Sequence, residues 1–385
     1  MSHIYDFYVK FIIESEAEGK KDVDNLTRGT GKYSEITDVY SRMLLLNNAF
    51  GVEGKFPDKE GRLKIDPDVY AKVGEKDYAS GLKALIHSNG NFNDYIACKL
   101  SEVHLLGIDS SIDISALPKG SWLIEFPITL AKPYISRDDE PFYIIENPVR
   151  KDKVFKVPLI SAMSWKGNLR WAMMKTHLEP MVNDPDKFAE IRFQHTLLFG
   201  TEKGLEEEPK GWTSYLDSLC SRAKEEYRNK LKEKFGKEDI PNLAGMLNFY
   251  PTFWDRIDME VINPHDRKTK TGTNPIYFEV VPEGAKGFFR LVYVPFYYLG
   301  KSLSDIELER KVLQDLWDLV EGLRKMMLTY GFSAKKSTGY GVIEEEWDRG
   351  ASKLMVKDLI GFEKFNSFRE LQRKVEKLKG EHTNE

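Results

Sequence analysis

Residues 146–171 read ENPVRKDKVFKVPLISAMSWKGNLRW, and this stretch decides the fold class. Two extended segments flank a basic turn and lead into a helix whose first turns carry Ser164, Lys166, Gly167 and Arg170. Free N–H groups and the positive dipole end at a helix N-terminus suit an anion, and glycine lets a sugar or backbone approach closely. The pattern indicates a phosphate-chain site, although serine followed by exposed lysine or arginine also begins many ordinary helices.

The composition is that of a soluble globular protein with charges of both signs. The chain has 385 residues, of which 41% are hydrophobic and 31% are charged, and its formal net charge is -4. A chain of this length allows two or three domains, or one elaborated domain. Because the net charge is small, any nucleic-acid site must be a local basic patch.

The small number of cysteines and the lack of long apolar runs indicate a cytoplasmic protein. Cys98 and Cys220 are the only cysteines, which excludes a cysteine-rich zinc site and is typical of a reducing compartment. The first residues lack the basic and apolar regions of a signal peptide. No run approaches the ~18 apolar residues of a membrane span. We therefore expect a cytoplasmic location.

Three regions are expected along the chain. Residues 1–118 form a mixed, mostly helical region, residues 119–350 form the core, and residues 351–385 supply a C-terminal helix and a polar tail. Within the core, residues from about 180 to 262 are expected to be an insertion, and residues 214–234 have the dense mixed charge of a solvated helix.

Hydrophobic periodicity and turn residues predict the individual elements. Strands are predicted at residues 5–13, 122–131, 142–145, 154–157, 276–281, 288–293 and 340–346. Helices are predicted at residues 34–50, 78–87, 92–106, 161–178, 188–199, 214–234, 306–330 and 367–379. From residue 122 onward, the order is typical of an α+β, ferredoxin-like (RRM-like) core, in which helices cover one face of an antiparallel sheet.

A second basic motif lies near the C-terminus. Residues 331–341 read GFSAKKSTGYG and combine three kinds of phosphate-binding group: glycines, hydroxyls such as Ser337, and the adjacent Lys335 and Lys336. Such a loop can curl around phosphates with its backbone N–H groups. The alternative is a helix C-cap at Gly331 followed by a flexible connection.

Two further basic segments supply candidate RNA contacts. Residues 262–273 read INPHDRKTKTGT and crowd His265, Arg267 and Lys268 into one turn-rich segment. Lys151 belongs to the basic turn ahead of the predicted helix. A solvated run of charge is the alternative interpretation of the first segment.

Carboxylates near the first motif are the candidate catalytic groups. Asp138, Asp139 and Glu146 precede the basic turn. Carboxylates beside a phosphate site can hold a divalent metal or orient a nucleophile. Alternatively, these side chains only balance the positive charges of the turn.

The two basic motifs together resemble the RAMP superfamily of CRISPR-associated proteins. The family pattern D-x-P-V-x-x-D, followed by P-x-I-P-G-S-S-L-K-G-x-x-R, is similar to residues 146–152 and 158–170, with the spacing kept within each segment. The basic loop of the family, which ends in G-Y-G, is similar to residues 335–341. The resemblance covers about residues 120–347, and leaves out the N-terminal region and the last helix.

This resemblance implies one or two ferredoxin-like units in a multisubunit effector that holds a CRISPR RNA and captures complementary RNA. It also implies that Lys166 and Arg170 contact guide phosphates and that Lys335 and Lys336 line the same path. Because base pairing reads the sequence, the protein needs only backbone contacts. Glu146 stands where the family pattern begins with aspartate, and backbone subunits of type III complexes use an aspartate to cut target RNA.

We therefore expect a guide-RNA-binding subunit of a type III-like CRISPR effector in antiviral defence. Its expected partners are CRISPR RNA, complementary target RNA and other effector subunits, with no membrane and no cofactor required for binding. The expected RNA contacts are Lys151, Ser164, Lys166, Arg170, His265, Arg267, Lys268, Lys335, Lys336 and Ser337.

Two enzymatic alternatives remain open. The same fold would act as a metal-dependent endoribonuclease if Mg²⁺ joined Glu146, Asp138 or Asp139 as the catalytic carboxylate. A stand-alone enzyme that processes repeat RNA would instead need a general base such as His265 near the glycine-rich loop.

Overall fold

The chain forms two compact units, each assembled from separated segments. The computed structural model describes residues 7–11, 25–51, 85–87, 92–138, 147–202, 211–236, 242–263, 276–300 and 303–383. Unit 1 comprises Met1–Ser110, Lys132–Leu159 and Phe253–Lys286, and unit 2 comprises Ser111–Ala131, Ile160–Thr252 and Gly287–Glu385. This division differs from the three consecutive regions that the sequence predicts, because the chain passes repeatedly from one unit to the other.

A five-stranded sheet forms the centre of unit 2. Its strands in spatial order are β3 (Leu247–Phe249), β7 (Lys286–Tyr293), β1 (Trp122–Thr129), β8 (Lys353–Val356) and β9 (Ile360–Glu363). Antiparallel pairing joins β3 to β7, β1 to β8, and β8 to β9. The predicted strands at residues 122–131 and 288–293 are confirmed as β1 and β7, whose apolar runs are buried.

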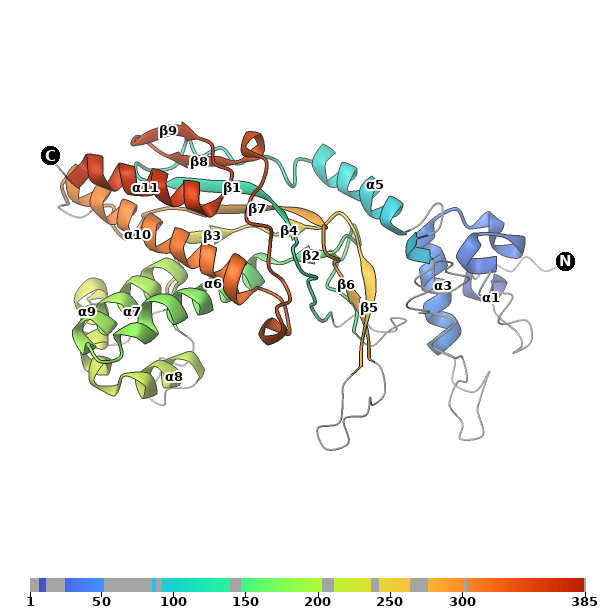
Figure 1. Ribbon diagram of the computed structural model, residues 1–385, viewed down its shortest axis with the longest axis horizontal. Helices are drawn as coiled ribbons and strands as arrows, with labels where there is room; N and C mark the ends of the chain where they lie inside the picture. Colours follow the sequence, from blue (N-terminus) through green and yellow to red (C-terminus); the bar gives the residue numbers. More distant parts are fainter. Residues whose placement is uncertain are drawn as a thin grey trace. The chain divides into compact units, whose positions relative to one another are not determined.

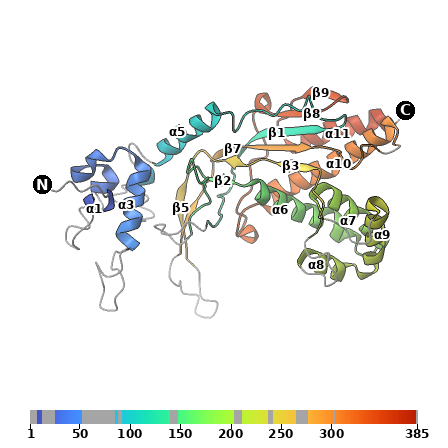
Figure 2. The same ribbon diagram turned by 180° about the vertical axis from the view of Figure 1, so that it is seen from behind.

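Helices cover one face of this sheet (Figures 1 and 2). They are α6 (Ala162–Met173), α10 (Asp305–Lys325) and α11 (Phe368–Thr383). Aromatic side chains fill the interface: the rings of Trp122 and Tyr293 stack at 4.8 Å, and Phe126 meets Phe368 edge-on at 5.5 Å. The three helices predicted at residues 161–178, 306–330 and 367–379 are confirmed. The first two continue into the π-helical turns Met174–Leu178 and Met326–Tyr330.

The strand predicted at residues 340–346 is wrong. In this segment Ile343 makes only an isolated bridge with Leu130, and Glu346 makes one with Ser367. Residues 344–346 are three exposed glutamates, which break the alternation that a half-buried strand requires. The strands β8 and β9 complete the sheet instead, so part of the region expected as a tail belongs to the core.

A helical group within unit 2 occupies much of the expected insertion (Figure 1). It contains α7 (Pro185–Phe199), α8 (Gly211–Leu219) and α9 (Lys224–Phe235), with short 3-10 helices at Glu179–Met181 and Ser221–Ala223. The prediction of α7 is confirmed, and Gly200 follows its last residue. The single helix predicted at residues 214–234 is instead split into α8 and α9 at Cys220.

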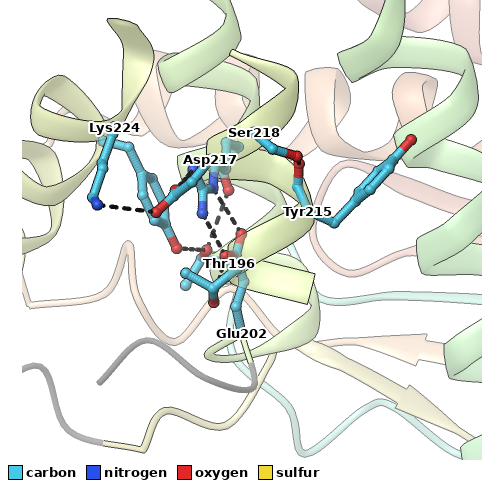
Figure 3. Close-up of polar contacts among 9 residues, drawn as sticks. Thr196, Glu202, Tyr215, Asp217, Ser218 and Lys224 are labelled. Carbon is cyan, nitrogen blue, oxygen red and sulfur yellow. Dashed lines mark hydrogen bonds and ion pairs between the residues drawn. The ribbon is translucent and has the colours of Figure 1, made fainter. Parts of the chain in front are cut away.

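A buried arginine holds this helical group together (Figure 3). The Arg192 guanidinium donates to both carboxylate oxygens of Glu202, at 3.0 and 2.7 Å, and to Asp217 at 2.7 Å. Thr213 donates to Glu202 at 3.1 Å, and Lys224 lies 3.6 Å from Asp217. Because two carboxylates share the buried cation, the network fixes α7 and α8 against each other.

Unit 1 contains short helices and a two-stranded sheet. Its elements are α1 (Phe7–Lys10), a 3-10 helix (Gly31–Glu35), α3 (Val39–Gly51), α5 (Phe92–Leu105), β5 (Asp258–Ile262) and β6 (Ile276–Val280). The strands β5 and β6 pair antiparallel. The short strands β2 (Leu159–Ile160) and β4 (Thr252–Phe253) span chain positions at which one unit passes to the other.

The sequence predictions in unit 1 have mixed outcomes. The helix at 92–106 is confirmed as α5, and the one at 34–50 forms only from Val39, after the 3-10 helix. The strand predicted at 5–13 is wrong in its described part, which is α1, where Phe7 and Phe11 meet at 5.3 Å across one helical turn.

Other predictions there are wrong or lie outside the described residues. The strand predicted at 154–157 is wrong, because Asp152 accepts the N–H groups of Val154 and Phe155 and turns the chain. Residues 142–145 and most of 78–87 lie outside the described residues. Among the residues that the structure describes, no helix is long and apolar enough to cross a membrane.

A buried carboxyl group joins α10 to α7 and β7. Asp315 accepts hydrogen bonds from Gln194 at 2.8 Å, from Tyr293 at 2.7 Å and from Tyr298 at 3.1 Å. Burial outweighs these donors and raises the pKa of Asp315 from 3.8 to about 6. The folded protein therefore binds this proton more tightly than the unfolded chain does.

We predict that Asp315→Asn changes how stability depends on pH. In the wild type, ionisation of Asp315 lowers the free energy of unfolding progressively as pH rises from about 4 to about 6. Because asparagine stays neutral, the variant should gain about 2–3 kcal/mol relative to the wild type across that window. Urea unfolding at pH 4 and pH 7 measures this gain, and an equal difference at both pH values would contradict the prediction.

Candidate nucleic-acid interface

The helix α6 begins with a serine cap. The Ser161 hydroxyl accepts the backbone N–H of Ser164 at 3.2 Å and lies 2.9 Å from the Ser164 hydroxyl. The first turn of α6, which is fully described, contains no acidic residue. The positive end of the helix dipole therefore has no carboxylate within that turn.

Burial of Trp165 decides which side of α6 faces outward. Its ring lies 5.1 Å from that of Phe289 and 4.7 Å from that of Phe332, and its indole N–H donates to Thr252 at 3.0 Å. Leu169, one turn later, is also buried. Since side chains three and four residues apart share a helix face, the positions opposite this pair are turned away from the core.

The outward face of α6 carries the predicted cations. Met163 is 83% exposed, Gly167 is exposed, and Lys166 and Arg170 are half-buried. Burial lowers the pKa of both cations, and the charge of Arg170 lowers that of Lys166 further. The negative charge of Glu202 partly opposes the lowering of the Arg170 pKa. Neither side chain makes an ion pair or hydrogen bond within the described parts of the chain. Two like charges one turn apart repel each other, so an external anion would stabilise this face.

Gly167 has no packing role among the described residues. A Cβ atom built on it would meet no described atom within 4 Å. Glycine inside a helix costs about 1 kcal/mol relative to alanine. The fold therefore does not explain this glycine, whereas close approach of a ligand backbone would.

The glycine-rich loop at residues 331–341 is closed at its base by two glycines. Gly331 and Gly341 have φ angles of +75° and +69°, and the N–H of Phe332 donates to the Gly341 carbonyl at 2.9 Å. A Cβ on Gly341 would lie 2.4 Å from Cβ of Ser333, and one on Gly331 would lie 2.5 Å from the Tyr340 carbonyl oxygen. Only glycine fits at either position.

The tip of this loop is exposed. Lys335, Ser337 and Gly339 are exposed, and the 3-10 turn Lys336–Thr338 lies between two residues with positive φ. Thr338 donates from its hydroxyl to the Lys335 carbonyl at 2.8 Å, which closes the turn. The loop therefore has a defined conformation, rather than being only a flexible connection after a helix cap.

Asn168 brings the loop and α6 together. Its side-chain amide donates to the Phe332 carbonyl, 164 residues away in sequence, at 3.2 Å. Lys336 donates to the Asn168 carbonyl oxygen at 2.7 Å, and its ammonium lies 4.5 Å from the ring centroid of Trp171. The sequence did not single out Asn168 or Trp171, because nothing local to α6 indicates a contact with so distant a segment.

Lys151 does not present its charge to a ligand. Its side chain is 1% exposed, and its ammonium forms an ion pair with the equally buried Glu279 in unit 1. The backbone N–H of Val149 donates to the same carboxylate at 3.0 Å. The expectation that Lys151 contacts RNA is therefore corrected, because this lysine neutralises a buried carboxylate.

The remaining candidates lie partly outside the described residues. His265, Arg267 and Lys268 are outside them, in the segment that follows β5 and precedes β6, and so are Asp139 and Glu146. Asp138 is half-buried and accepts the backbone N–H of Lys151 at 3.3 Å. Among the described residues no group of three or more potential metal ligands lies together.

Comparison with known proteins identifies the family. A sequence model of the RAMP superfamily matches residues 87–344. The chain belongs to the RAMP superfamily. The resemblance found in the sequence is thereby confirmed, and the match reaches into the region before β1. No curated protein sequence matches this RAMP chain.

Two solved structures similar to this RAMP chain are of CRISPR complexes. One is a chain of the type III-B Cmr-beta complex bound to cognate target RNA, with 13% identity, a TM-score of 0.38, and coverage of 87% of this chain and 99% of that one. Another belongs to a CRISPR RNA-guided surveillance complex in a pre-nicking state, with 11% identity, a TM-score of 0.31, and coverage of 60% and 79% respectively.

We predict that Lys151→Met destabilises the protein without weakening RNA contacts in the folded state. The substitution leaves the Glu279 carboxylate buried without its cation, which typically costs about 3–5 kcal/mol. The double variant Lys151→Met/Glu279→Gln should recover much of this loss, because glutamine is neutral and can still accept the Val149 N–H. Thermal unfolding of both variants measures the effect. A stable Lys151→Met protein with weakened RNA affinity would contradict it.

Proposed function

We propose that this RAMP chain is a guide-RNA-binding subunit of a type III-like CRISPR effector that captures complementary RNA in antiviral defence. Family membership supports the effector class. The observation that carries RNA binding is the meeting, within unit 2, of the outward face of α6 with the glycine-rich loop. That face holds two cations that make no direct ion pair or hydrogen bond among the described residues, although the charge of Glu202 acts on Arg170.

The order of elements in unit 2 supports a ferredoxin-like, RRM-like core. Along the chain β1 is followed by α6, then β3 and β7, then α10, and then β8. In space the four strands lie in the order β3-β7-β1-β8, so the first and third strands are neighbours at the centre. A split βαβ arrangement of this kind places both helices on one face of the sheet.

The chemistry of the surface favours a nucleic-acid backbone over a base-specific contact. Lys166 and Arg170 supply charge for phosphate oxygens, and Gly167 leaves room for a sugar. In an RNA-guided complex the sequence is read by base pairing, so backbone contacts suffice. The proposed RNA contacts are Ser164, Lys166, Arg170, Lys335, Lys336 and Ser337, together with His265, Arg267 and Lys268 outside the described residues.

The proposed partners follow from this role. They are a CRISPR RNA, the complementary target RNA and neighbouring effector subunits, in the cytoplasm. Contacts from ammonium, guanidinium and hydroxyl groups to phosphate need no cofactor.

We predict that Lys166→Ala combined with Arg170→Ala weakens binding of single-stranded RNA and reduces its salt dependence. Each lost phosphate contact should reduce the slope of log affinity against log salt by about 0.7, so the pair should reduce it by roughly 0.7–1.4. Fluorescence anisotropy with a labelled RNA at several salt concentrations measures both quantities.

A matched control separates a local contact from a change in net charge. Lys187→Ala combined with Arg222→Ala removes the same charges from α7 and a 3-10 helix, where both residues are exposed. This control should keep the wild-type slope. If the two double variants show the same slope, the proposed function is wrong.

A further inference from the structure

The side-chain amide of Asn168 uses all of its hydrogen-bonding groups. Its NH₂ donates to the Ser164 carbonyl at 2.9 Å, within α6, and to the Phe332 carbonyl at 3.2 Å, at the base of the glycine-rich loop. Its carbonyl oxygen accepts from Lys336 at 2.7 Å. Backbone carbonyls only accept and an ammonium only donates, so this chemistry permits one orientation of the amide.

Lys336 is held in place while its charge stays uncompensated. Its ammonium binds a neutral amide and lies over the face of Trp171, and no carboxylate among the described residues pairs with it. Burial lowers its pKa from the ordinary value. A carboxylate in place of the amide would fix the lysine more strongly but would cancel the positive field at the loop.

The loop needs a second anchor besides its glycine base. The bond between Phe332 and Gly341 closes the loop but leaves the direction of its tip to other contacts. The bonds of Asn168 to Phe332 and Lys336 reach both the base and the tip from α6. They set the place of Lys335 and Ser337 relative to Lys166.

We propose that Asn168 is a positioning residue that holds the glycine-rich loop against α6, so that one RNA backbone contacts the loop tip and the cations of α6 together. Lys336 then acts as the anchor of the loop, and its direct contact with phosphate is secondary to that role. This inference rests on the proposed function. It means that the neutral side chain of Asn168 sets the geometry of the site.

Two substitutions at Asn168 and one control test the proposal on the full-length protein. Asn168→Ala removes the anchor and keeps every charge. Asn168→Asp keeps an acceptor for Lys336, but it removes both donors and adds a negative charge. Asn183→Ala is the control, because Asn183 is exposed and has no hydrogen bond within the described parts of the chain.

Hydrogen exchange and RNA titration give separate expected results. In Asn168→Ala the loop amides should exchange about fivefold to a hundredfold faster, since two hydrogen bonds to the loop are lost. RNA affinity should fall, and the salt slope should fall by about 0.7 for each loop cation that no longer reaches a phosphate. In Asn168→Asp the slope should fall by about 0.7, because the new carboxylate neutralises Lys336.

Other outcomes would overturn the proposal. Unchanged loop exchange in Asn168→Ala would mean that Asn168 does not hold the loop. Faster exchange throughout unit 2 with a lower melting temperature would make Asn168 a general structural residue. Faster loop exchange with unchanged RNA affinity would mean that RNA binding does not depend on the position of the loop. A failure of the proposed function can be told apart from a failure of this inference. The first would appear as an unchanged salt slope in the Lys166 and Arg170 double variant, and the second as unchanged hydrogen exchange of the loop in Asn168→Ala.

Discussion

Burial of Trp165 is the constraint on which the proposed interface depends. Its ring packs against Phe289 of the sheet and Phe332 of the glycine-rich loop, and its N–H is satisfied by Thr252. One side chain therefore fixes α6 against both the sheet and the loop. Lys166, the next residue, is rotated by about 100° around the helix from the buried tryptophan and is half-buried.

The resulting surface is unfavourable for the protein by itself. Lys166 and Arg170 stand one helical turn apart and repel each other. Gly167 also weakens the helix without a packing role among the described residues. Such local conflicts concentrate at functional sites, where a ligand supplies the missing partner. A polyanionic backbone would supply a partner for these cations and would use the space that Gly167 leaves open.

Much of this arrangement could be predicted from the sequence, and the reasons for the failures are physical. The strand at β1 and the helix at α10 have long periodic or buried apolar patterns, which local sequence specifies well. The strand β8 is only four residues long and follows a turn, so its place in the sheet depends on pairing with the distant β1. The segment with the three glutamates at 344–346 follows glycines, as a strand often does. It lacks the alternation of apolar and polar side chains that a half-buried strand requires.

The candidate site shows the same limit. Local motifs identified Lys166, Arg170 and the glycine-rich loop, because helix starts and glycine loops carry sequence signatures. They could not show that Lys151 is paired with Glu279, or that Asn168 links the two motifs. Both contacts involve residues more than 100 positions apart in the sequence. Charge in a basic turn therefore indicates a binding surface only when tertiary contacts leave it uncompensated.

The central claim is that the open space above Gly167 is occupied by an RNA backbone, and Gly167→Ala tests it most directly. The account predicts that the variant is as stable as the wild type or more stable, by up to about 1 kcal/mol, because alanine favours the helix and its Cβ meets no described atom. It also predicts weaker binding of single-stranded RNA, because the Cβ fills the space of the sugar-phosphate chain. Retained stability together with wild-type RNA affinity would contradict the account.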